Sequence, residues 1–342
     1  MSDFQQKQHD RYYAKMLKYK DLLPSLVQDY LVSLVRTSIK TQADYSYTLF
    51  QFFKYLVEQN PALKEGKKKP KDVTCNEISL IRAQDINEYI SFLINQHHNS
   101  TASIRKALTV LNSFFTFLND LEIIDHNPVR NGMMPRLKEK LTIDHLDRSD
   151  MDKLLNVVSN GASLEGQRKT YHKKLSARDT AIITVFLKTG VRLSECVGLN
   201  LSDLNFEKCQ FYVSRKGYSK DNKQTIYMSD LVYEALKKYV EVRKKIIPVE
   251  GDEDALFLST QRKRISERSV QRMVKKYAKD LSCYNDKVSP HTLRRSYGTA
   301  LYEETNDIYL VSAGLNHRSI DVTAKYYASM DDERRKKAYT TL

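Results

Sequence analysis

The segment Ser289–Tyr297 has the sequence SPHTLRRSY and predicts a helix that opens at Pro290. Proline is tolerated at the start of a helix, because the N–H that it lacks would have no partner there. His291 then lies in the first turn, and Arg294, three positions on, shares its face. An imidazole beside a guanidinium fork suits the oxygens of a phosphate. The pair alone also fits a solvated helix surface, so the sequence on either side decides between the two interpretations.

Length and charge limit the class of protein. The chain has 342 residues, which suits two domains, and a net charge of +14, which favours a polyanionic partner, most simply nucleic acid. It has no apolar run of about 18 residues that could span a membrane, and no signal peptide at its N-terminus. Its cysteines are scattered: Cys75, Cys196, Cys209 and Cys283. Without paired spacing they argue against a zinc site or a disulfide framework, and for a cytoplasmic protein.

Apolar residues at helical spacing predict a bundle in the first third of the chain. Helices are expected within residues 23–55, 83–95 and 102–118. The residues expected to face its core are Tyr45, Leu49, Phe52, Phe53, Leu56, Leu108, Leu111, Phe114, Phe115 and Leu118. Arg105 and Lys106, at the start of the third helix, are candidates for contact with a DNA groove.

The chain divides into four segments on this interpretation. Residues 1–22 are polar and form either a short helix or a partly disordered arm. Residues 23–131 form the helical, DNA-binding domain, closed by Asn127-Pro128, and residues 132–147 are typical of a linker. Residues 148–342 form the second domain.

In the second domain, the spacing of apolar residues changes once from a helical to a β-strand pattern. Residues 210–214 and 224–228 are β-type runs on either side of a polar turn, which predicts a hairpin. Helices are expected over residues 178–188, 231–245, 267–279, 291–304 and 307–315, with an extended segment at 254–259. The fold class is therefore mainly α, with a helical N-terminal bundle and a mostly helical second domain that contains a small antiparallel sheet. Arg268, Gln271 and Arg272 lie on a polar helix face and are further candidates to read DNA.

The candidate site begins at the end of the helix that stops at Gly190. Arg192 follows this stop, and Glu195, one turn on, can hold its geometry. The other residues that suit phosphoryl transfer are Lys216, His291, Arg294, His317 and Tyr326. Arginines can neutralise a pentacoordinate phosphate and a lysine can protonate the departing oxygen. A tyrosine, with an unperturbed pKa of about 10, needs basic neighbours before it can attack.

Taken in order, these residues resemble the signature of the tyrosine recombinases, the phage integrase family. The motifs that carry the resemblance are TGVRLSE (189–195), Lys216-Gly217, HTLR (291–294), Leu315-Asn316-His317 and SIDVTAKYY (319–327). The N-terminal bundle resembles the family's core-binding domain, so the resemblance covers nearly the whole chain. The motifs and compact length resemble the Xer type, which resolves chromosome dimers. The N-terminal extension and the long first-domain loop resemble Xer variants that act without a partner recombinase.

The resemblance implies a mechanism. Tyr326, selected over Tyr327 by its nine-residue distance from the second histidine, would attack the scissile phosphate of duplex DNA. A 3′-phosphotyrosyl link would form and a 5′-hydroxyl would leave. Because the link keeps the energy of the phosphodiester, no ATP, metal or other cofactor is needed.

The resemblance also assigns the remaining roles. Arg192 and Arg294 would hold the non-bridging oxygens, and Lys216 would be the general acid. His291 would serve as a base or a hydrogen-bond donor, and His317 as a further donor to the phosphate. The family's assembly implies a homo-tetramer on two paired DNA sites, in the nucleoid, with an accessory regulator in some cases. The tail, residues 328–342, resembles a segment that docks on a neighbouring protomer, and it also fits a frayed terminus.

The sequence departs from the family pattern at three places. Asn316 replaces the usual glycine, and asparagine is the next best residue for a left-handed helix end. Arg295 stands where the family often has histidine. The long hairpin loop leaves Lys220 and Lys223 as rivals to Lys216. The alternatives are an integrase of a mobile element, a non-catalytic DNA-binding protein of the same fold, and a type IB topoisomerase.

Overall fold

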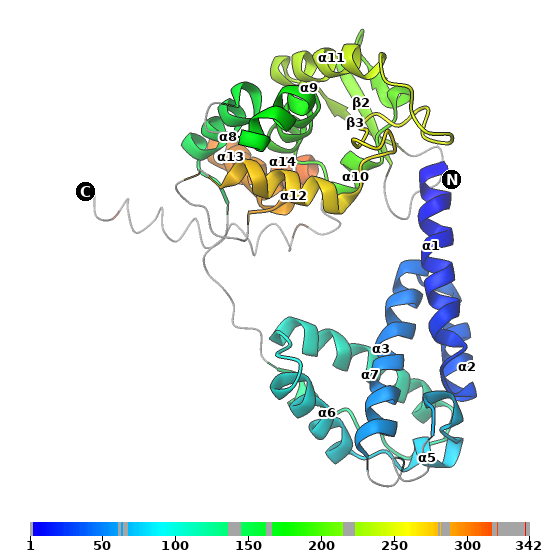
Figure 1. Cartoon of the computed structure of the whole chain (residues 1–342). Helices are drawn as coiled ribbons and strands as arrows, with labels where there is room; N and C mark the ends of the chain where they lie inside the picture. The colour runs from blue at the N-terminus through cyan, green and yellow to red at the C-terminus, as the bar shows by residue number, and fades with distance from the viewer. Residues whose placement is uncertain are drawn as a thin grey trace. The chain divides into compact units, whose positions relative to one another are not determined.

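The chain forms two compact units, Met1–Glu139 and Lys140–Leu342, in a computed structural model (Figure 1). The structure describes residues 3–60, 63, 68–135, 145–161, 166–214, 223–279, 281, 288–316, 320 and 339. The two units are considered separately below.

The first unit is all helical in its described residues. Its elements are α1 (Asp3–Lys20), α2 (Ser25–Ser33), η1 (Leu34–Arg36), α3 (Ile39–Gln59), η2 (Pro70–Asp72), α5 (Cys75–Ser79), α6 (Ala83–Asn95), α7 (Thr101–Asp120) and η3 (Asn131–Met133). Helix α1 packs along α3, so the N-terminal segment is a regular helix of 18 residues (Figure 1). The helix predicted within residues 23–55 is interrupted, because Ser38 accepts from the backbone N–H of Thr41 and starts a new helix there.

The core of the first unit is aromatic. The predicted core residues of α3 and α7 are all buried except Tyr45, which is partly exposed. Phe52, Phe53 and Phe114 are 0% exposed and pack edge to face with neighbouring rings. Burying one such side chain contributes about 1.5–3 kcal/mol, so this spacing is enough to specify the bundle.

The second unit is built around one long helix whose C-terminal half is apolar. Its elements are α8 (Arg148–Asn160), α9 (Gly166–Thr189), α10 (Leu193–Val197), η4 (Leu201–Asp203), β1 (Leu204–Asn205), β2 (Gln210–Ser214), β3 (Lys223–Tyr227), α11 (Asp230–Arg243), α12 (Glu267–Ala278), α13 (Pro290–Thr305) and α14 (Ile308–Leu315). Helices α8, α11 and α13 pack against α9, whose apolar C-terminal half is buried. The prediction for this helix began too late, at residue 178. Its first turns are polar and carry no apolar period that would reveal them.

The small sheet is antiparallel, in the order β1-β2-β3. Strands β2 and β3 form the predicted hairpin, in a register that pairs Ser214 with Lys223 and Val213 with Gln224. Strand β1, of two residues, was too short to predict. Residues 254–259 form isolated bridges at Ala255 and Leu258 instead of a strand. The predicted fold class, mainly α with a small antiparallel sheet, is confirmed.

Two further predictions concern the described residues. None of their helices is long and apolar enough to cross a membrane. Within the same ranges, no group of three or more histidine, cysteine or acidic side chains could hold a metal ion.

Candidate active site

Arg192 is positioned by a sharp turn between two helices. Gly190 ends α9 with φ +61°, and Arg192 is then extended, as the N-cap of α10. A Cβ built at Gly190 would lie 2.3 Å from Cδ1 of Tyr297, on α13. Only glycine can take this backbone conformation at that distance from the ring. The close approach of α9 and α13 therefore depends on glycine at position 190.

The guanidinium of Arg192 is held on one side and open on the other. Its Nη1 donates to Glu195 Oε1 at 2.8 Å, and its Nη2 donates to the backbone oxygen of Asn316 at 2.7 Å. Glu195 Oε2 also accepts from the backbone N–H of Arg192 at 2.7 Å. The side chain of Arg192 is 40% exposed, and that of Glu195 only 8%. The carboxylate therefore fixes the arginine while part of the fork faces solvent.

Arg294 is buried beneath the same turn. It lies on α13, which opens at Pro290 as predicted and which Ser289 caps. Its Nη1 donates to the backbone oxygen of Gly190 and its Nη2 to that of Leu315. The oxygens of Leu315 and Asn316, adjacent in the chain, thus accept from Arg294 and Arg192 respectively. The structure brings the two predicted arginines together at the end of α14.

His291 lies one helical turn before Arg294, and its side chain is exposed. Desolvation by the protein atoms around the ring lowers its pKa, and the cations of Arg295 and Arg294 lower it further. Because the unperturbed value is about 6.5, the imidazole is neutral at neutral pH. A neutral imidazole has one donor and one acceptor nitrogen, which suits either role expected of it.

Asn316 ends α14 in the left-handed conformation, with φ +54°. Its side chain replaces the hydrogen atom of the usual glycine and reaches the sheet. The Nδ2 of Asn316 donates to Oε1 of Gln224, on β3, at 3.0 Å. The predicted tolerance of asparagine for this helix end is confirmed.

Of the three lysine candidates for the general acid, Lys223 is paired with a carboxylate. Lys223 donates to Oδ1 of Asp203, whose side chain is 5% exposed. An ammonium paired with a buried carboxylate is less available to a leaving group than a solvated one. Lys216 and Lys220 lie outside the described residues, as do His317 and Tyr326.

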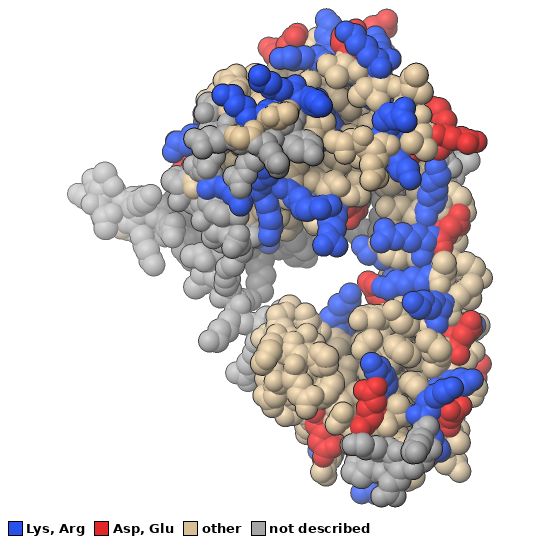
Figure 2. Space-filling view, viewed as in Figure 1, with Lys and Arg blue, Asp and Glu red and all other residues tan. Residues whose placement is uncertain are grey.

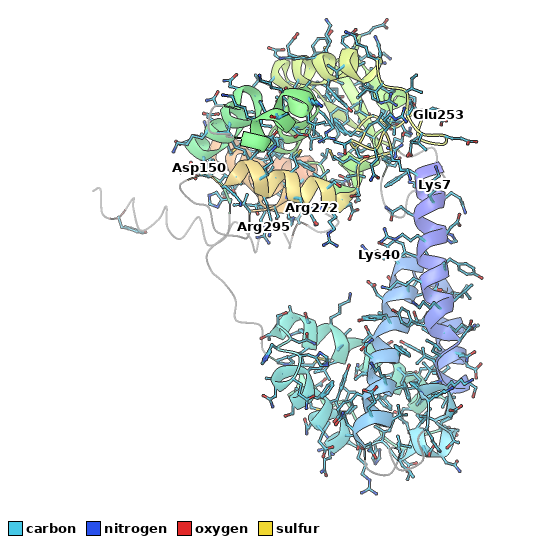
Figure 3. The ribbon with its side chains drawn as sticks, in the orientation of Figure 1. Lys7, Lys40, Asp150, Glu253, Arg272 and Arg295 are labelled. Atoms are coloured by element: carbon cyan, nitrogen blue, oxygen red, sulfur yellow. The ribbon has the colours of Figure 1, made fainter. Side chains whose placement is uncertain are left out.

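The candidate DNA-reading residues are all exposed. Arg268, Gln271 and Arg272 lie on the solvent side of α12, whose opposite face is buried. Figure 2 shows lysine and arginine side chains over α12, and Figure 3 labels Arg272 and, on α13, Arg295.

In the first unit, the candidates Arg105 and Lys106 lie at the start of α7. Lys106 is 3.3 Å from Asp44, which also pairs with Lys15 of α1 at 3.4 Å. Arg105 donates to the backbone oxygen of Pro135 at 3.4 Å. Helix α1 therefore contributes to the same basic surface.

Sequence reasoning singled out Glu195 beside Arg192 but missed the other groups that hold the two arginines. Backbone oxygens carry no residue signature, so Leu315 and Asn316 could not be recognised as their acceptors. Gln224 gave no signal because a single polar residue in a strand is common. A buried network was also missed, in which Tyr277 joins Asp179 to His172.

Known proteins that this chain resembles belong to one family. A model of the phage integrase family matches residues 145–334. Tyrosine recombinase XerC of Caldanaerobacter subterraneus is 32% identical over 95% of this chain and 88% of that protein. Tyrosine recombinase XerS of Streptococcus thermophilus is 29% identical over 94% of this chain and 96% of that protein.

Among solved structures, XerH site-specific recombinase bound to its difH substrate has a TM-score of 0.61 with 19% identity, over 84% of this chain and 75% of that one. At this identity the likeness shows the fold. The chain therefore belongs to the phage integrase family, whose members are the tyrosine recombinases. Its full-length relatives are of the Xer type, as is this chain.

Proposed function

We propose that this protein is a site-specific DNA recombinase that cuts and rejoins duplex DNA through a 3′-phosphotyrosyl intermediate. The observation that carries the proposal is the pair of arginines gathered on consecutive backbone oxygens. Arg294 is fixed by the oxygens of Gly190 and Leu315, and Arg192 by Glu195 and the oxygen of Asn316. Two guanidinium groups held in place before the substrate arrives suit a phosphate that gains charge in the transition state.

The other steps use residues of the same motifs. Tyr326 is the nucleophile, and the departing 5′ oxygen takes a proton from a hairpin lysine, for which Lys216 is the first candidate. His291 accepts the proton of the attacking hydroxyl or donates a hydrogen bond to the phosphate, and His317 is a further donor to the phosphate. The covalent link conserves the phosphodiester energy, so the religation step needs no ATP and no metal.

The biological role that we propose is the resolution of chromosome dimers, linked to chromosome partition and cell division. The support is that relatives named XerC and XerS match over nearly their whole lengths. A homo-tetramer on two paired duplexes, acting at the nucleoid with or without an accessory regulator, is part of this proposal. Integration of a mobile element is the second candidate, and the genes next to this one would distinguish the two.

The nucleophile can be tested by trapping. Purified protein is mixed with a library of nicked duplexes, and a protein–DNA adduct that survives denaturation is sought for the wild type, Tyr326→Phe and, as a matched control, Tyr327→Phe. We expect the adduct to vanish only in Tyr326→Phe, and sequencing of the trapped DNA to give the target site.

Other results would each contradict part of the proposal. DNA binding without an adduct in the wild type would favour a non-catalytic binding protein. Loss of the adduct in Tyr327→Phe alone would move the nucleophile by one residue. Relaxation of supercoiled plasmids that lack the trapped site would favour a topoisomerase.

A further inference from the structure

The turn at Leu315 and Asn316, whose backbone oxygens accept from both arginines, is also bound to the sheet by a hydrogen bond between side chains. Leu315 and Asn316 end α14, a helix of eight residues. Tyr309 is 68% and Leu310 47% exposed, and the apolar side chains that anchor the helix are Val311 and Leu315, with the partly buried Ile308 beside them. A short helix with so few buried anchors does not by itself fix the positions of its last two carbonyl oxygens.

The attachment comes from the sheet. Oε1 of Gln224 accepts from Nδ2 of Asn316 at 3.0 Å, and the two residues are 92 positions apart in the sequence. Gln224 is held in the ladder opposite Val213, which is 1% exposed. Its neighbour Lys223 is fixed by the buried carboxylate of Asp203. The end of α14 is therefore tied to a backbone whose position is set independently.

We propose that Gln224 and Asn316 are positioning residues for the two arginines. Their hydrogen bond fixes the turn whose oxygens orient Arg192 and Arg294, so that the guanidinium groups are ready before DNA binds. The inference rests on the proposed function, because it concerns the phosphate that these arginines would hold. The proposal gives a structural role to Asn316, which stands where the family usually has glycine.

The physical basis is the difference between asparagine and glycine. Both residues accept a positive φ, so either can end the helix. Only asparagine has a side chain that can reach Gln224 while its own backbone oxygen accepts from Arg192. Asn316→Gly therefore removes the hydrogen bond and leaves the helix end without strain.

The test is a double-mutant cycle on single-turnover cleavage of the trapped site. Gln224→Ala and Asn316→Gly should each slow adduct formation about threefold to tenfold, the range expected for one neutral hydrogen bond. The double variant should be no slower than either single variant, because the same interaction is removed. Thr225→Ala, on the opposite face of the same strand, is the matched control and should keep the wild-type rate.

A second substrate separates positioning from a general loss of structure. A methylphosphonate at the scissile position lacks one charged non-bridging oxygen, so the arginines contribute less to its cleavage. The loss in Gln224→Ala should be smaller on this substrate than on the phosphodiester. An equal loss on both substrates would overturn the inference, as would wild-type rates in the two single variants or a double variant whose loss is the product of theirs. Failure of the wild type to form any adduct would instead overturn the proposed function.

Discussion

At the scale of single residues, the two arginines are held in different ways. Arg294 is 6% exposed, and its guanidinium depends on backbone oxygens, which carry no net charge and cannot be titrated. Arg192 is more exposed, and it donates to the carboxylate of Glu195, whose negative charge offsets its own, and to the backbone oxygen of Asn316. A buried arginine that loses a partner is destabilised, so the turn at Leu315 contributes to keeping Arg294 in place.

Gly190 is the residue on which this geometry depends most directly. Gly190→Ala should lower the free energy of unfolding by about 2–4 kcal/mol, because alanine meets both the cost of a positive φ and a clash with Tyr297. Chemical denaturation followed by circular dichroism measures the change. Gly132→Ala is the control, since a Cβ there has no heavy atom within 4 Å, and it should change stability by less than about 0.5 kcal/mol. Equal stabilities of the two variants would contradict the role given to the turn.

At the scale of elements, helices α9 and α12 are joined by polar groups inside the second unit. Tyr277 donates to Asp179 Oδ2 at 3.0 Å and lies 3.2 Å from Nδ1 of His172. Arg178 pairs with the same carboxylate at 2.7 Å. Desolvation raises the pKa of Tyr277 and lowers that of His172, for which the nearby cation of Lys276 adds to the effect.

This network predicts how stability changes with pH. The pKa of His172 is lower in the folded state than its unfolded value of about 6.5, so the unfolded chain binds more protons as the pH falls. The stabilisation is present above pH of about 6.5 and is lost as the pH falls below it. Melting temperatures of the wild type should therefore drop between about pH 6.5 and 5 more steeply than those of His172→Gln. Parallel curves for the two proteins would show that His172 does not carry the dependence.

At the scale of the whole molecule, the net charge of +14 favours binding to a polyanion. Each unit has its own basic surface, with Lys15 and Lys106 on the first and Arg268 and Arg272 on the second. Phosphate contacts release counterions, so affinity for duplex DNA should fall steeply with salt.

The slope of log affinity against log salt concentration reports how many phosphate contacts the protein makes. Arg272→Ala should reduce the slope of log affinity against log salt by about one, because one phosphate contact is lost. Fluorescence anisotropy with a labelled duplex over a range of salt concentrations measures this slope. Lys244→Ala is the control, since Lys244 pairs with Glu241 on α11, and it should leave the slope unchanged. The same slope in all three proteins would remove Arg272 from the DNA-binding surface.

The parts of the fold that could be predicted from the sequence are those set by interactions between residues close together in the chain. Apolar periodicity predicted α6 with both its bounds and placed Phe52 and Phe114 in the core, because a helix face is a local property. Pro290 predicted the start of α13 for the same reason. The polar start of α9 and the two-residue strand β1 were missed because packing against the rest of the unit, and not local preference, stabilises them.

The sequence by itself determined the helical class, the family and the identity of the residues proposed to act on phosphate, since these depend on residue types in a fixed order. The sequence also singled out Glu195 as a partner of Arg192, but only the tertiary structure showed the other contacts of the two arginines. These are with the backbone oxygens of Gly190, Leu315 and Asn316, groups that every residue possesses. The tie between Asn316 and Gln224 is likewise invisible in the sequence, because a hydrogen bond between residues 92 positions apart exists only once the sheet and α14 have packed together.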